Sequence, residues 1–81
     1  MIYPVQIRAA RALLNLSQHE LADRSLVGLA TIKRIEASGL RLTGTAQTLA
    51  RLQETLQAAG VEFIEQNGAQ GPGVRFRDPL P

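Results

Sequence analysis

His19 and Glu20, with Ser17 two positions before His19, are residue types that suit nucleophilic or acid–base catalysis. An imidazole activates a nucleophile only where the two side chains come within hydrogen-bond reach. No nucleophile stands at a usable spacing from His19, because Ser17 is better explained as a helix cap, and the glycines do not form a phosphate-binding loop. We therefore expect no enzymatic activity.

The composition limits which metal sites and which charged ligands the chain can be expected to have. The chain has no cysteine and a single histidine, so we expect no disulfide, no metal site and no cofactor. Nine Lys and Arg residues, eight of them arginine, oppose seven Asp and Glu and give a net charge of +2. This mild excess neither establishes nor excludes nucleic acid, because clustering of the cations on one face decides the matter.

Helical patterns occupy the first part of the chain. Apolar side chains recur at helical spacing from Pro4 to Leu14, and proline suits a first helical turn. A second helix is predicted to begin after Ser17, because Ser17 and Glu20 form a capping box and Leu16 can pack on Leu21. Together with the third helix described next, these patterns predict two short helices joined by a turn.

That next element is a third helix over 29–37, with Gly28 as its N-cap, followed by a fourth over 46–59. The character then changes. Residues 61–65 alternate in a strand-like way, and residues 74–77 form a second candidate strand after a glycine-rich loop. The sequence predicts a β-hairpin after four helices.

A helix-turn-helix holds two helices at a fixed angle, so that the second can lie in the major groove while the first crosses the DNA backbone. Five residues are suited to the packing that this geometry needs: Leu21, Ala22, Val27, Ile32 and Ile35. The stretch from Gln18 to Ala37 resembles the lambda-repressor-like, or Xre-type, regulators. The positions that carry the resemblance are Gln18, Glu20, Leu21, Ala22, Val27, Ala30, Thr31, Ile32, Arg34, Ile35 and Glu36.

The resemblance implies a mainly α fold, a four- to five-helix lambda-repressor-like DNA-binding bundle over residues 1–60. A C-terminal β-hairpin or strand pair with a tail then occupies residues 61–81. The resemblance also implies a bidentate ion pair between Arg11 and Glu36 that fixes the angle between helices. The alternative is two solvated surface charges.

The resemblance further implies contacts with double-stranded DNA. Gln18 corresponds to a phosphate contact, the alternative being a solvated residue in the first turn. The start and exposed face of the third helix comprise Gly28, Leu29, Ala30, Thr31, Lys33 and Arg34. Lys33 or Arg34 is suited to reading guanine, Thr31 to donating to a base or phosphate, and Leu29 or Ala30 to contacting a thymine methyl. Arg41, in the following loop, is a further phosphate candidate.

Two residues depart from the family pattern. Leu26 stands where the family usually has glycine, so either the backbone there is left-handed and strained by roughly 1–2 kcal/mol, or the turn differs. Leu29 replaces a residue that is often polar and reads bases. Both substitutions make the expected DNA-facing surface more apolar, which favours a protein contact there.

The hairpin is expected to serve dimerisation, because an isolated two-stranded hairpin is marginally stable in water. Pairing of strands across a two-fold axis would extend the sheet and bury apolar side chains. The residues assigned to this interface are Val61, Phe63, Ile64, Val74 and Phe76. The alternatives are a segment folded over its own fourth helix, or one that is disordered until bound.

These observations predict a sequence-specific, double-stranded DNA-binding transcription regulator, a repressor or autoregulator that acts as a homodimer on a palindromic operator. The alternative is an antitoxin or antiactivator whose main role is to bind another protein. No apolar run reaches the roughly 18 residues of a membrane span and the N-terminus shows no signal pattern, so we expect a cytoplasmic protein without membrane contact.

Overall fold

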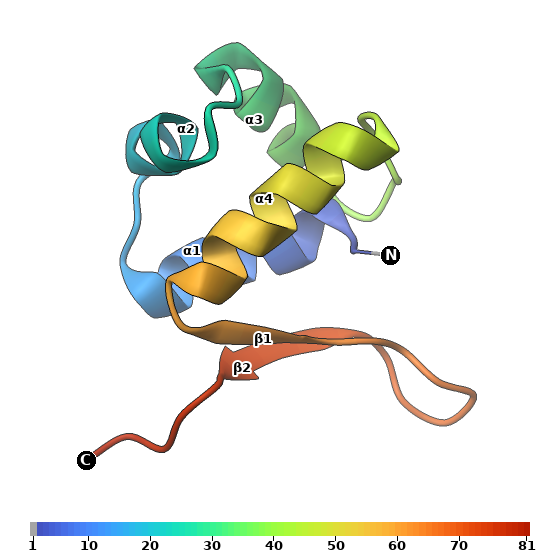
Figure 1. Cartoon of the computed structure of the whole chain (residues 1–81). Helices are drawn as coiled ribbons and strands as arrows, with labels where there is room; N and C mark the ends of the chain where they lie inside the picture. The colour runs from blue at the N-terminus through green and yellow to red at the C-terminus, as the bar shows by residue number, and fades with distance from the viewer. Residues whose placement is uncertain (1) are drawn as a thin grey trace.

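The structure, a computed structural model, describes residues 2–81 and consists of four helices followed by two antiparallel strands (Figure 1). The elements in chain order are α1 (Pro4–Leu14), α2 (Gln18–Ser25), α3 (Leu29–Ala37), α4 (Ala46–Ala58), β1 (Val61–Ile64) and β2 (Gly73–Phe76). The predicted mainly α fold with a C-terminal strand pair is confirmed. None of the helices within residues 2–81 has both the length and the apolar character needed to cross a membrane.

The start of α2 is held by the capping box that the sequence indicates. Ser17 Oγ accepts a hydrogen bond from the Glu20 amide at 3.0 Å, and the Glu20 carboxylate accepts one from the Ser17 amide at 2.9 Å. Two backbone donors that the helix leaves unpaired are thereby satisfied. The bond from the Ser17 amide, with a smaller contribution from the Ser17 hydroxyl, lowers the pKa of Glu20.

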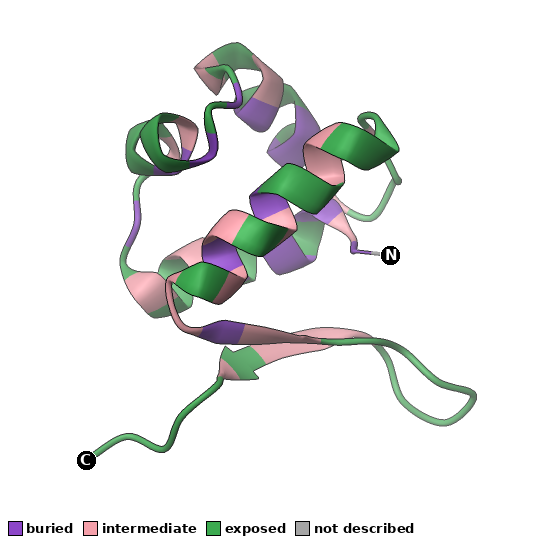
Figure 2. Ribbon diagram, in the orientation of Figure 1, coloured by how far each residue is buried: buried purple, intermediate pink, exposed green. Residues whose placement is uncertain are grey.

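The helices enclose one apolar core. Their buried faces turn toward the interior in Figure 2, while the hairpin loop and C-terminal tail are exposed. The side chains with the least exposure come from every helix and from β1, and include Ile7, Leu21, Ile32, Ile35, Leu52, Leu56 and Val61. Burial of this set orients α2 and α3 on the bundle, because both helices bury one apolar side and leave the other in solvent.

The hairpin packs against α1 and α4 of its own chain (Figure 1). Val61 is opposite Phe76 and Phe63 is opposite Val74, so these four side chains lie on one face of the sheet. Val61 is buried, and Phe63 and Val74 pack against the core. The strands therefore pair within one chain, and the arrangement agrees with the alternative in which the segment folds over its own bundle.

Gln6 on α1 holds the loop end of the hairpin. Its side chain is buried, and its Nε2 donates to the carbonyl oxygens of Gly73 and Ile64 at 3.0 and 3.3 Å. Its Oε1 accepts from the Tyr3 amide at 2.7 Å. One amide side chain thus connects the first turn of α1 to both strands, 58 and 67 residues further along the chain.

Candidate nucleic-acid interface

The recognition helix of the motif is α3, and its two sides differ sharply. Ile32 and Ile35 are buried, which fixes α3 on the bundle. The predicted contact residues lie around the rest of the helix, where Ala30, Lys33 and Arg34 are exposed and Leu29 and Thr31 are half-buried. The helix begins at Gly28, which is the N-cap and is itself exposed. The helix therefore presents two cations and several small or apolar side chains to solvent.

The turn before α3 keeps its left-handed geometry despite the leucine. Leu26 has φ 61° and ψ 24° and is 81% exposed. Its amide donates to the Ala22 carbonyl at 2.9 Å, which ends α2 in the manner of a left-handed cap. Of the two possibilities raised by the sequence, the strained left-handed backbone is the one observed, at a cost of roughly 1–2 kcal/mol.

A buried ion pair joins α1 to α3. Arg11 Nε donates to Glu36 Oε2 at 2.7 Å, and Arg11 Nη2 donates to Glu36 Oε1 at 2.6 Å. The Glu36 side chain is 3% exposed and that of Arg11 is 19% exposed. The arrangement is bidentate, which fixes orientation as well as distance between the two helices.

Two further hydrogen bonds extend this pair to α2. Gln18 Nε2 donates to Glu36 Oε1 at 3.2 Å, and Arg11 Nη1 donates to the Leu16 carbonyl at 2.9 Å. The hydrogen bond to Glu36 raises the pKa of Arg11, and the Coulombic attraction acts in the same direction while burial opposes them. The network positions the N-terminus of α2 relative to α3, which is the geometric requirement of the motif.

Gln18 retains capacity for a DNA phosphate. A side-chain amide nitrogen carries two hydrogens, and Glu36 uses one of them. Gln18 is half-buried and lines a surface hollow with Lys33. The structure thus brings these two predicted contact residues together at the junction of the helices.

The remaining predicted contacts lie elsewhere. Gly28 and Thr31 line a second hollow with Thr48 and Arg51 of α4. Arg41 is exposed in the loop after α3, where Leu40 and Leu42 are also exposed, at 76% and 48%. The predicted contact residues therefore form several separate features rather than a single pocket.

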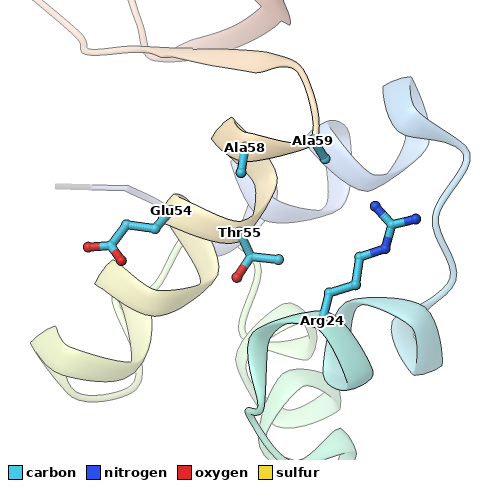
Figure 3. Close-up of a pocket in the computed structure, with 5 residues that line it drawn as sticks. All are labelled: Arg24, Glu54, Thr55, Ala58 and Ala59. Atoms are coloured by element: carbon cyan, nitrogen blue, oxygen red, sulfur yellow. The ribbon is translucent and has the colours of Figure 1, made fainter.

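A groove between α2 and α4 carries none of the predicted residues (Figure 3). It has a volume of about 410 Å³ and is lined by Arg24, Glu54, Thr55, Ala58 and Ala59. The Arg24 side chain extends alongside the C-terminal end of α4, and Glu54 points away from it (Figure 3). Within residues 2–81, no group of three or more His, Cys, Asp or Glu side chains is arranged to hold a metal ion.

Comparison with known families agrees with this geometry. A family model described as helix-turn-helix matches residues 7–61, about two thirds of the chain. The chain belongs to the Xre-type, lambda-repressor-like helix-turn-helix family. A search of curated proteins found no match to it.

The matched residues include all four helices except the first three residues of α1, and they contain the whole motif. This helix-turn-helix protein is accordingly a DNA-binding transcription regulator. The match ends at Val61, the first residue of β1, so the rest of the hairpin lies outside it.

Sequence reasoning missed Gln6. Its position four residues before the buried Ala10 places it on the buried side of α1, and this spacing is the signal that could have identified it. A polar side chain in an apolar stripe needs hydrogen-bond partners. Those partners are distant in the sequence, so the pattern within α1 does not reveal them.

Proposed function

We propose that this helix-turn-helix protein represses or autoregulates transcription by binding a palindromic operator as a homodimer. The single observation that supports the sequence-specific part is the exposed side of α3. Lys33 and Arg34 have no hydrogen bond or ion pair within residues 2–81, while Ile32 and Ile35 fix the helix from behind. Rigid placement of unpaired cations is what base reading in the major groove requires.

The proposed contacts divide into two classes. Gln18 and Arg41 donate to phosphates and set the orientation of the protein on the duplex. On α3, Lys33 or Arg34 reads guanine, Thr31 donates to a base or phosphate, and Leu29 or Ala30 contacts a thymine methyl close to the Gly28 cap. A cytoplasmic location is part of the same proposal, since the chromosome is the proposed target.

Selection of bound fragments from random duplex DNA tests this proposal. We expect one recurrent palindromic sequence, with affinity that falls steeply as salt rises. Arg34→Ala should lower the preference for that sequence by about 1–3 kcal/mol per lost bidentate contact at unchanged fold. Arg24→Ala, which removes an exposed arginine from the groove in Figure 3, is the matched control. Equal effects of the two substitutions would contradict base reading by Arg34.

The proposed dimer uses the free edges of the hairpin. The side chains assigned to it, other than Ile64, are on the face that packs against α1 and α4, so the backbone edges are the parts left for pairing. The Arg77 amide donates to the Gly60 carbonyl at 3.0 Å, and hydrogen-bonded pairs alternate along an antiparallel ladder. The amides of Phe63 on β1 and of Val74 and Phe76 on β2 consequently point outward.

Light scattering of the full chain gives the oligomeric state, and amide hydrogen exchange locates the interface. We expect a dimer at micromolar concentration in which the Phe63 amide, or those of Val74 and Phe76, exchange more slowly as concentration rises. A monomer well above micromolar concentration would show that the dimer proposal is wrong. A dimer with fast exchange at both edges would move the interface to another surface. Removal of residues 61–81 is a poor test, because Val61 belongs to the core.

An antitoxin or antiactivator role is the second candidate, and exposed leucines favour it. Leu26 and Leu40 are 81% and 76% exposed and flank α3 in the sequence. Protein–DNA interfaces are more polar and more positively charged than protein–protein interfaces, so these two leucines fit a protein partner better than a duplex. Failure to bind any duplex, combined with loss of regulation in a Leu26→Ser variant of unchanged fold, would favour this role over operator binding.

A further inference from the structure

A surface hollow of about 400 Å³ lies beside the ion pair, where α1, α2 and α3 meet. It is lined by Arg8, Arg11, Gln18, Lys33, Glu36 and Ala37. Three of these side chains are cationic and one is a carboxylate, so the hollow has two positive charges in excess. An anion with several acceptor oxygens is the ligand that such a donor set fits.

Arg8 and Lys33 are the two cations in this hollow that are free to bind. Both are exposed, and neither has a hydrogen bond or ion pair within the part of the chain that the structure describes. The Arg11 guanidinium is instead committed to Glu36 and to the Leu16 carbonyl. A ligand in the hollow would therefore be held by Arg8 and Lys33, with Arg11 and Glu36 as a fixed floor.

Helix geometry puts these two cations on opposite sides of the ion pair. Arg8 precedes Arg11 by one turn of α1, and Lys33 precedes Glu36 by one turn of α3. The Val5 amide donates to the Gly39 carbonyl at 3.2 Å, so the N-terminus of α1 meets the C-terminal end of α3. The two helices therefore run in opposite directions where the ion pair joins them. One turn back along α1 leads from Arg11 to Arg8 on one side of the pair, and one turn back along α3 leads from Glu36 to Lys33 on the other side.

We propose that Arg8 and Lys33 clamp one backbone phosphate of duplex DNA over the Arg11–Glu36 pair. The inference rests on the proposed DNA target and assigns roles within it. Lys33 and Arg34 differ by about 100° around the helix axis, so they face different parts of the duplex. Lys33 then contacts the backbone next to Gln18, whose second amide hydrogen is available to the same phosphate, and Arg34 is the cation that reads bases.

The test uses the full chain and a fluorescent duplex of random sequence, with affinity measured from about 50 to about 200 mM salt. Each neutralised phosphate contributes about 0.9 to the slope of log affinity against log salt. The clamp joins two cations at one phosphate, so we expect Arg8→Gln and Lys33→Gln each to lower the slope by up to about 0.9, and the double variant to lower it by no more than that.

Arg24→Gln is the control that removes the same charge elsewhere on the surface, and it is expected to leave the slope nearer that of the unsubstituted chain. Because Arg8 and Lys33 are exposed and unpaired within residues 2–81, both variants should unfold at the same temperature as the unsubstituted chain. On a selected operator, Lys33→Gln should weaken binding by the same factor as on random duplex. Arg34→Gln should weaken operator binding by a larger factor than random binding.

Several outcomes overturn the clamp. If the chain binds duplex and neither Arg8→Gln nor Lys33→Gln lowers the slope more than Arg24→Gln does, the clamp is wrong and the proposed function stands. If the unsubstituted chain binds no duplex, both fail. A Lys33→Gln effect confined to the operator makes Lys33 a base-reading residue. Inorganic phosphate is the probe for a free anion. If it shifts the Gln18 amide resonances while Arg8→Gln and Lys33→Gln leave the salt dependence of duplex binding unchanged, the hollow binds free phosphate instead of the DNA backbone.

Discussion

The two ends of α2 differ in how well their residues suit the backbone that they adopt. At the N-terminus, Ser17 and Glu20 satisfy backbone amides, and Gln18 joins the Arg11–Glu36 pair. At the C-terminus, Leu26 adopts a left-handed backbone with its side chain 81% exposed. The first end stabilises the angle between helices, whereas the second end costs free energy and places an apolar group in solvent. The N-terminal end of α2 therefore holds the scaffold together, while the C-terminal end leaves an apolar side chain exposed.

The largest expected effect on stability is loss of the ion pair at the N-terminal end of α2. Glu36→Gln keeps the shape but leaves the Arg11 charge, 19% exposed, without its counter-charge. We expect the free energy of unfolding to fall by about 3 kcal/mol, as measured by urea denaturation. The double substitution Arg11→Met with Glu36→Leu should lose less, because no unpaired charge remains. A greater loss in the double variant would show that the pair is needed for more than neutralisation.

Removal of the cap should have a smaller effect at the same end. Ser17→Ala leaves the Glu20 amide without its 3.0 Å partner, and we expect a loss of about 1 kcal/mol in the free energy of unfolding. Ser17→Asp restores an acceptor at the N-cap and serves as the control. An equal loss in both variants would mean that the hydroxyl acts through packing rather than capping.

At the C-terminal end of α2, relief of backbone strain should raise the free energy of unfolding. Leu26→Gly removes the penalty of the left-handed backbone and restores some freedom to the unfolded chain, so we expect a net gain of about 0.5–1 kcal/mol. Leu26→Ala removes the exposed side chain and keeps the strain, so it should bring no such gain. The two variants together separate backbone strain from side-chain exposure. Equal stability of both variants would show that the left-handed backbone at Leu26 carries no such penalty.

The smallest expected effect is on pH dependence. The folded-state pKa of Glu20 is lowered from its ordinary value of 4.5, so the unfolded chain binds the proton more tightly. The capping contribution is present above pH 4.5 and is lost as pH falls through the lower folded-state pKa. Glu20→Gln keeps a box-forming side chain without the titration. Between about pH 7 and about pH 3, the free energy of unfolding should therefore fall slightly more for the unsubstituted chain than for Glu20→Gln. Denaturation at the two pH values measures this difference.

Much of the motif could be predicted because its signals are local. Ser17 and Glu20 are three residues apart, and the spacing of Leu21, Val27, Ile32 and Ile35 follows from helix periodicity. Such interactions need no knowledge of distant chain segments. These local patterns alone established the helices, the capped start of α2 and the family, but they left the backbone at Leu26 open between two geometries.

Contacts between segments far apart in the sequence became apparent only in the folded structure. Gln6 bonds to carbonyls more than fifty residues away, and the hairpin turns Val61 and Phe63 toward its own bundle. Lys33 and Arg34 are adjacent and both basic, yet only Lys33 lines the hollow with Arg8. Residue types record what a side chain can bind, but its partner depends on how the helices cross. That crossing is set by burial of the whole core.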